Sequence, residues 1–304
     1  MSESLKLEKV HQLTGHNASI FCVDESVEDT HFLSGAGDGW LVEWDFREPE
    51  LGRLLAKVET QIFALKHLKG SSNVVVGNMN GGVHWVDLSQ PDETKNIAHH
   101  QKGVFSILHY DDWVLTAGGG GMISRWDIDQ KRVIDSLHLT NQSLRCLDYS
   151  PARNEIAVGA SDHDIYLLDA QDFTIRKQLK KAHDNSVFTI KYSPDQKRLF
   201  SGGRDAMLKV WDLHTFECLS TQPAHWFTIN DMAFSPNGQW LATASRDKTI
   251  KIWDAHSLKL LKVLDTARDG CHVNSVNSLF WSSFDNTLVS CSDDRSIILW
   301  RIGT

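Results

Sequence analysis

The strongest constraint on the fold is a dipeptide that returns at nearly constant spacing through the 304 residues of the chain. Tryptophan followed by aspartate occurs four times in this frame, and other residues occupy the frame three more times. The tryptophan position recurs after 42, 40, 42, 43, 42 and 47 residues. Such a period indicates an array of like units that bury their apolar faces against one another. The seven positions are Trp44, Val86, Trp126, Leu168, Trp211, Trp253 and Trp300.

A second pattern of seven pentapeptides runs in phase with the first. In each window a large aliphatic residue precedes a central residue, and a small or polar residue and then an apolar residue follow it, as in SIFCV at 19–23 and SVFTI at 186–190. Period-two alternation predicts that the flanking aliphatic residues enter the core and that the central residues face the other way. The central residues are Phe21, Phe63, Phe105, Arg145, Phe188, Asn230 and Asn277.

The fifth repeat shows how one unit is built. Segments 187–192, 198–203 and 207–212 are predicted strands separated by turns, and a fourth strand begins at Cys218. Proline in the first turn, SPDQK, stands where a strand cannot continue. No segment has a 3.6-residue apolar period over eleven or more residues, so the chain is predicted to be all-β.

The repeated W-D frame resembles the WD-repeat (WD40) β-propeller family over essentially the whole chain. The resemblance implies a seven-bladed β-propeller with four-stranded antiparallel blades around a central channel, and we expect residues 1–304 to form this one domain. The last repeat ends in its third strand, at Trp300. The alternating N-terminal segment at about 5–13 is therefore expected to supply the missing outer strand of blade seven and close the ring.

Four repeats contain histidine, serine or threonine, aspartate and tryptophan at matching offsets. Such a set invites a hydrolase interpretation. A catalytic triad is needed only once, however, and the resemblance implies a buried hydrogen-bond chain from indole to hydroxyl to imidazole to carboxylate. The four sets are His16-Ser34-Asp38-Trp44, His183-Ser201-Asp205-Trp211, His225-Thr243-Asp247-Trp253 and His272-Ser290-Asp294-Trp300.

Blades two, three and four depart from this pattern. Blade three has Gly120 at the aspartate position, whereas blade two has Val58 and Val86 at the histidine and tryptophan positions. Blade four keeps Asp162 but has Leu168 in place of tryptophan. We expect the networks of these three blades to be broken or absent, so that apolar packing holds them.

Composition narrows the classes of function. The net charge is −8, which disfavours nucleic acid or an anionic membrane as the main partner. No apolar run of 18 residues is present, so no membrane span is expected. The five cysteines never form C-x-x-C, which favours a reducing compartment, either the cytoplasm or, in a eukaryote, the nucleus.

Other candidate motifs point to no chemistry. The GGGG run at 118–121 lacks the lysine and the helix of a phosphate loop and is predicted to be a turn. The pair 99–100 and the triplet 162–164 contain possible metal ligands, but one residue of each already has a place in the repeat. We expect no metal and no cofactor. Trp226, in a loop between blades, is expected to be exposed.

The predicted site is the rim of the channel. The family resemblance implies that the seven central residues lie there, on the face that also carries the turn aspartates. Residues just before the turn aspartates, including Arg204 and Arg246, are expected on the same face. Aromatic and arginine side chains dominate interface hot spots, so we expect a non-catalytic scaffold that binds a partner peptide or protein. The alternatives are residues that only plug the channel, an enzyme, and a nucleic-acid-associated or ribosome-associated propeller.

Overall fold

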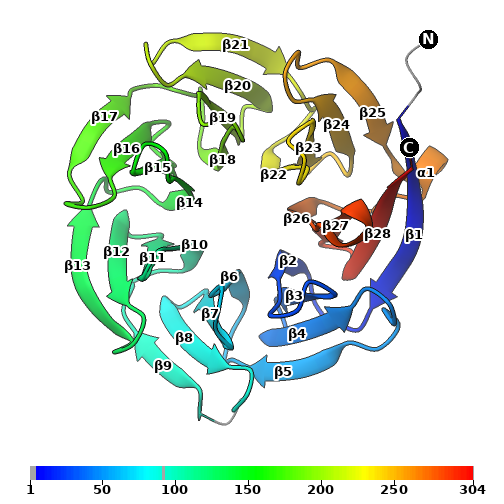
Figure 1. Ribbon diagram of the computed structural model, residues 1–304, viewed down its shortest axis with the longest axis horizontal. Helices are drawn as coiled ribbons and strands as arrows, with labels where there is room; N and C mark the ends of the chain where they lie inside the picture. The colour runs from blue at the N-terminus through cyan, green and yellow to red at the C-terminus, as the bar shows by residue number, and fades with distance from the viewer. Residues whose placement is uncertain (1–4, 91–92, 304) are drawn as a thin grey trace.

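The computed structural model describes residues 5–90 and 93–303. Seven four-stranded antiparallel sheets stand around a central channel like the blades of a propeller (Figure 1). In every blade one strand lies at the channel and the others follow toward the outside, in chain order in blades one to six and with β1 outermost in blade seven. The predicted all-β, seven-bladed architecture is confirmed.

Blades one to four follow the chain in order. The first two contain β2 (Ile20–Glu25), β3 (His31–Ala36), β4 (Trp40–Asp45), β5 (Arg53–Lys57), β6 (Ile62–His67), β7 (Asn73–Asn78), β8 (Gly82–Asp87) and β9 (Lys95–Ala98). The next two contain β10 (Val104–Tyr110), β11 (Trp113–Gly118), β12 (Met122–Asp127), β13 (Arg132–His138), β14 (Leu144–Ser150), β15 (Glu155–Ala160), β16 (Ile165–Asp169) and β17 (Ile175–Leu179).

Blades five to seven complete the ring. Blades five and six contain β18 (Val187–Tyr192), β19 (Arg198–Gly203), β20 (Met207–Asp212), β21 (Cys218–Pro223), β22 (Ile229–Phe234), β23 (Trp240–Ser245), β24 (Ile250–Asp254) and β25 (Leu260–Leu264). Blade seven contains β26 (Val276–Trp281), β27 (Thr287–Ser292), β28 (Ser296–Gly303) and β1 (Lys6–Thr14). The described helices are short, namely α1 (Thr266–Asp269) and the 3-10 turn η2 (Phe284–Asn286).

The N-terminal strand closes the ring as predicted. Strand β1 pairs antiparallel with β28, so that Leu7 faces Ile302 and Leu13 faces Ile297. Both leucines are buried, and Leu7 packs in the apolar cluster that also contains Trp300. The two ends of the chain thus share one sheet, and β1 covers the edge of β28 that would otherwise be unpaired.

A β-bulge recurs at the start of all seven innermost strands. The register of β2 against β3 shifts between Ile20 and Cys22, with Phe21 as the extra residue, and the same shift occurs at each of the other six central residues. Because of the bulge, Ile20 and Val23 pack in one apolar cluster although they are three positions apart. The equivalent pairs in the other blades also share a cluster. Period-two alternation was therefore the wrong explanation for the direction of the central residues, because the β-bulge changes the direction in which the side chain points.

Candidate functional site

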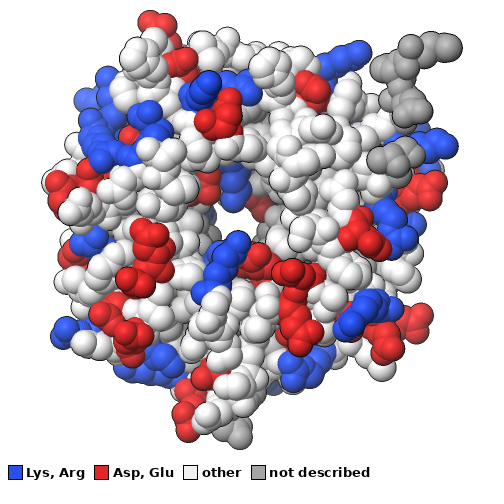
Figure 2. Space-filling model, viewed as in Figure 1, with Lys and Arg blue, Asp and Glu red and all other residues white. Residues whose placement is uncertain are grey.

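The channel between the innermost strands encloses about 590 Å³. Its wall is formed by all seven innermost strands, and it is open at the centre of the molecular surface (Figure 2). The seven central residues all line it, each with a partly exposed side chain. We call these seven, which were predicted from the sequence, the rim belt: Phe21, Phe63, Phe105, Arg145, Phe188, Asn230 and Asn277.

Aromatic and cation–π contacts link the rim belt from blade one to blade five. The Phe21 and Phe63 rings lie 5.0 Å apart, and the Phe63 and Phe105 rings lie 5.6 Å apart. The Arg145 guanidinium lies between two rings, 4.4 Å from that of Phe105 and 5.2 Å from that of Phe188. Such contacts contribute about 0.5–2 kcal/mol each. These five side chains therefore brace neighbouring blades as well as facing the channel.

Amide hydrogen bonds continue the rim belt through blades six and seven. Asn230 Nδ2 donates to the Val276 carbonyl of the next blade (2.8 Å). Asn277 Nδ2 donates to the Ile20 carbonyl of blade one (2.9 Å) and to Asp293 (2.8 Å). The two asparagines thus make the inter-blade contacts that phenylalanine makes elsewhere.

The rim belt lies on the face that carries the turn aspartates, as expected. Arg145 Nε donates to Ser161, the residue before Asp162 (2.9 Å), and Asn277 bonds Asp293, the residue before Asp294.

Arg204 and Arg246 are on this face but outside the channel. Their backbone N–H groups pair with the carbonyls of Ser186 and Thr228, in the loops that precede β18 and β22. Both side chains are exposed, and neither forms an ion pair within 4 Å in the described part of the chain. Burial, aided by the nearby Arg204 charge, lowers the pKa of Arg145. The three arginines thus give this face a positive side.

An exposed apolar group accompanies these arginines. Trp226 is 86% exposed and Phe227 is 59% exposed, in the loop between β21 and β22, and Val273 is 62% exposed in the corresponding loop before β26. The backbone N–H of Trp226 donates to Asp247 (3.0 Å), the residue after Arg246. Trp226 and Arg246 therefore come from adjoining turns. The exposure of Trp226 was predicted. Phe227 and Val273 were missed, although other repeats have polar residues directly after the loop histidine.

Arg268 is a different case. In α1 it forms hydrogen bonds and an ion pair with Asp265, so its charge is balanced inside its own loop. Of the arginines predicted for this face, Arg204 and Arg246 are therefore the exposed ones that form no ion pair among the described residues.

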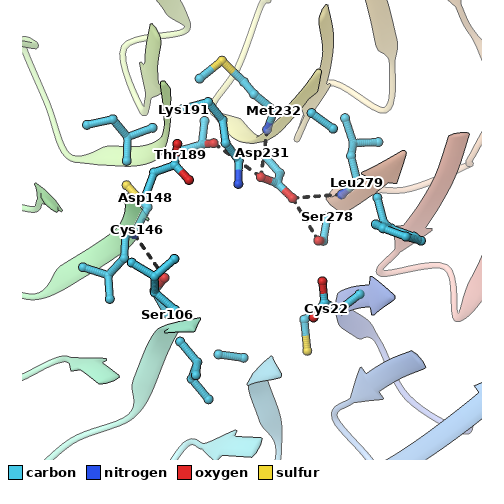
Figure 3. A pocket seen from close by; sticks show the side chains of 18 of the residues that line it. Cys22, Ser106, Cys146, Asp148, Thr189, Lys191, Asp231, Met232, Ser278 and Leu279 are labelled. Carbon is cyan, nitrogen blue, oxygen red and sulfur yellow. Dashed lines mark hydrogen bonds between the residues drawn. The ribbon is translucent and has the colours of Figure 1, made fainter. Parts of the chain in front are cut away.

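Charged side chains inside the channel were also missed. Asp24, Lys66, Asp148, Lys191 and Asp231 all line it. Figure 3 shows Lys191 and Asp231 projecting toward the channel from neighbouring strands. Lys66 Nζ donates to Asp24 (2.8 Å), whereas no carboxylate of the described residues lies within 4 Å of Lys191 Nζ.

Three of these carboxylates each fasten one blade to the next. Asp24 accepts from the His67 N–H (3.0 Å), Asp148 from the Tyr192 N–H (2.6 Å) and Asp231 from the Leu279 N–H (2.9 Å). In each case the acceptor belongs to one innermost strand and the donor to the next. The sequence did contain a signal for these channel charges, namely a charged residue in the middle of an innermost strand, as in VFTIKY and SLRCLDY.

Burial and charge set the titration of this group. Burial raises the pKa of Asp148, and Lys191 and the Tyr192 N–H only partly offset it. Burial alone would lower the pKa of Lys191, but Asp148, Asp231 and Asp24 outweigh it and raise that pKa above its usual value. Lys191 therefore keeps its positive charge inside the channel.

The four triad-like sets form the hydrogen-bond chain that the resemblance implied. In blade five the Trp211 indole N–H donates to Ser201 Oγ (2.9 Å), and Ser201 bonds His183 Nε2 (2.7 Å). His183 Nδ1 lies 2.9 Å from Asp205. Blades one, six and seven repeat this arrangement.

The geometry of these sets favours structure over catalysis. The four hydroxyl-bearing residues are fully buried, and each accepts an indole N–H, so no substrate reaches them. Burial would raise the pKa of Asp205, Asp247 and Asp294, but hydrogen bonds from their histidines outweigh it and lower these pKa values.

Blades two and four lack the tryptophan network as predicted and pack apolar side chains at its positions, but both also contain polar contacts that were not predicted. In blade two, Asn78 Nδ2 donates to Glu59 (2.8 Å), and Asn78 Oδ1 accepts from the Gly82 N–H (2.8 Å). In blade four the Tyr166 hydroxyl donates to Asp162 (2.6 Å). Different side chains thus satisfy the turn in both blades. In blade three the network is broken as predicted, because His100 and Thr116 are bonded but no carboxylate follows.

The other motifs have structural partners. His99 bonds Ser124 (2.8 Å), and Asp164 accepts from Gln178 (2.6 Å). Within the described residues, no three histidine, cysteine, aspartate or glutamate side chains are grouped so as to hold a metal ion. All five cysteines are free, and none of the described helices is long and apolar enough to cross a membrane.

The family model described as "WD domain, G-beta repeat" matches residues 7–45, 175–212, 216–254 and 259–301, which together exceed half of the chain. The chain belongs to the WD40-repeat family. The matched segments contain the four complete networks, those of blades one, five, six and seven. The unmatched residues 46–174 contain most of the three blades that depart from the pattern. Among solved structures, the WD40 propeller domain of Doa1 has a TM-score of 0.86 at 19% identity, with 97% of each chain covered.

Curated relatives are more distant. Guanine nucleotide-binding protein subunit beta-5b of Danio rerio is 23% identical over 66% of this chain and 53% of its own length. The THO complex subunit 6 homolog of Danio rerio is 24% identical over 40% of each chain. WD repeat-containing protein 1 of Mus musculus is 30% identical over 26% of this chain and 14% of its own length. The chain thus spans about half or less of the length of these relatives.

Proposed function

We propose that this WD40 chain is a non-catalytic scaffold of the cytoplasm that binds a partner protein or peptide across the rim face. The observation that carries the proposal is the exposure of Trp226, Phe227 and Val273 in loops of the face that also carries the exposed Arg204 and Arg246. Bulky apolar side chains are costly to leave in water, and exposed aromatic and arginine side chains on one face are typical of interface hot spots. Two of the relatives are named as subunits, which agrees with a role in an assembly.

The charges suggest the chemistry of the partner. Arg204 and Arg246 are exposed in a chain of net charge −8, so this side of the face would attract acidic groups of a partner. Trp226 and Phe227 would bury apolar side chains of the same partner. The rim belt of Phe21, Phe63, Phe105, Arg145, Phe188, Asn230 and Asn277 would contact the part that lies over the channel. An extended, partly apolar acidic segment meets all three demands.

A basic partner side chain inserted among the phenylalanines is the opposite arrangement. Cation–π attraction of about 0.5–2 kcal/mol would favour it. The Arg145 guanidinium, however, already lies 4.4 Å from the Phe105 ring and 5.2 Å from the Phe188 ring. A second cation there would meet both occupied rings and a like charge. The contacts of Arg145 therefore favour the acidic partner.

Affinity capture from the source cells tests the proposal. The double charge reversal Arg204→Glu with Arg246→Glu, and separately Trp226→Ala, should each weaken capture of the main partner at least about tenfold. Matched controls are Arg132→Glu in β13 and Leu51→Ala, since Leu51 is 85% exposed and follows β4 on the other side of its blade.

The two poses separate in the same assay. Phe63→Ala with Phe105→Ala should weaken capture in either pose, whereas the charge reversals should spare a basic partner. Unchanged capture by every rim variant, with β-sheet circular dichroism intact, would place the interface elsewhere.

A further inference from the structure

The complete blades show how this protein binds a carboxylate. In blade five, Asp205 accepts from three donors: His183 Nδ1 (2.9 Å), the Asp184 N–H (3.1 Å) and the Met207 N–H (3.1 Å). Blades one, six and seven present the same three donors to their aspartates at 2.9–3.1 Å. Each site is thus a fixed arrangement of an imidazole N–H and two backbone N–H groups.

Blade three keeps the imidazole of this arrangement and lacks the acid. His100 is 6% exposed, and its Nδ1 is buried without a hydrogen-bond partner among the described residues. The Trp126 indole donates to Thr116 Oγ1 (2.8 Å), and His100 Nε2 lies 2.8 Å from the same oxygen. Because the described residues offer the Thr116 hydroxyl no other acceptor, it donates to Nε2. Nδ1 then carries the proton and is an unused donor.

The backbone donors are also in place. Met122 pairs with His138 as Met207 pairs with Pro223, so the Met122 N–H occupies the position of the third donor. Gln101 follows His100 as Asp184 follows His183, and its N–H has no acceptor among the described residues.

The position of the missing carboxylate is open. A Cβ placed on Gly120 would meet no atom within 4 Å. Gln101 is exposed and Gly120 is partly exposed, so this turn lies at the surface of the rim face, whereas His100 Nδ1 itself is buried. Lys102, also exposed, lies beside the same turn, with its Cβ 2.9 Å from where a Cβ on Gly119 would stand. Three donors, free space and a lysine beside the turn suit an anionic group that only accepts hydrogen bonds.

We propose that blade three holds a carboxylate-binding site formed by His100 Nδ1 and the Gln101 and Met122 N–H groups, and that an aspartate or glutamate side chain of the partner fills it. The proposal rests on the proposed function in one respect, that the acid comes from a partner docked on the rim face. The partner's carboxylate takes the place that Asp205 takes in blade five. The site is on a different blade from Arg204 and Arg246, so it would fix the direction in which an acidic segment crosses the ring.

NMR titration of the whole chain tests the site without any partner. The probes are acetate and a blocked Gly-Asp-Gly peptide, added at constant ionic strength against chloride. Both should shift the His100 ring and Gln101 amide signals saturably, and Gly120→Asp should weaken this response at least about tenfold by supplying its own carboxylate. Arg204→Glu with Arg246→Glu should leave the response intact, so failure of the rim proposal and failure of this one are distinguishable.

Three results would overturn the proposal. Absence of a saturable shift with either probe removes the site. An equal shift in Gly120→Asp locates the binding elsewhere. A response to acetate but not to the peptide shows a site for small anions that does not admit a partner side chain.

Discussion

Acid should destabilise blade three, and a single substitution should remove the effect. Burial, with a small contribution from His99, lowers the pKa of His100 to about 4 from its usual 6.5. Between these two values the unfolded chain binds a proton that the folded chain does not. The contribution of neutral His100 to the free energy of unfolding is therefore complete above pH 6.5 and is lost as the pH falls toward 4. At 1.36 kcal/mol per pH unit, the loss is about 3 kcal/mol.

Gly120→Asp places a carboxylate next to the buried imidazole. The new acceptor should raise the pKa of His100 and so reduce the loss of unfolding free energy between pH 6.5 and 4 by at least about 1 kcal/mol. At neutral pH the completed network should add about 1.5–3 kcal/mol, the value of a hydrogen bond to a charged group. Gly120→Asn is the matched control, because its amide oxygen accepts from Nδ1 without carrying a charge. It should stabilise the blade and leave the pH dependence unchanged.

The assay combines two measurements. NMR titration of the His100 ring gives its pKa directly, and urea unfolding at several pH values gives the free energy for the parent chain and both variants. A parent His100 that titrates near 6.5, or a pH dependence that is the same in the parent and in Gly120→Asp, would refute the reasoning.

Two further predictions concern the ring. Deletion of residues 1–13 removes most of β1 and exposes the edge of β28, so we expect aggregation or a large loss of thermal stability; a truncated chain that melts like the full chain contradicts the closure by β1. Hydrogen exchange resolved by peptide should be faster over residues 58–170 than over 183–300, and fastest in blade three, where His100 lacks an acceptor; uniform protection would count against a stabilising role for the complete networks.

The architecture was predictable because its signals are local and repeated. Tryptophan 10 residues after serine, and aspartate 22 residues after histidine, bring the same groups together in blades one, five and seven. Ring closure followed from an incomplete last repeat and an alternating N-terminal segment. Each inference needed only the sequence of one blade and of its neighbour.

The parts that were missed depend on contacts between blades. The bulge at Phe21 is a feature of pairing between β2 and β3, and a period of two cannot show it. Asp148 appears in the sequence as an ordinary polar residue, and only the ring brings it to the Tyr192 N–H of the next blade. Replacement of the tryptophan network by Asn78 and Glu59 in blade two likewise required knowing which side chains meet.

The central claim, that the rim face binds the partner, is tested most directly by hydrogen exchange of the complex against the free chain. Captured partner should slow exchange at residues 225–229, 246–249 and 272–276, which form the loops and turns around Trp226, Arg246 and Val273. The turns at 193–197 and 235–239, at the far ends of the innermost strands, should be unaffected. Protection confined to those turns, or to the outer strands, would contradict the account.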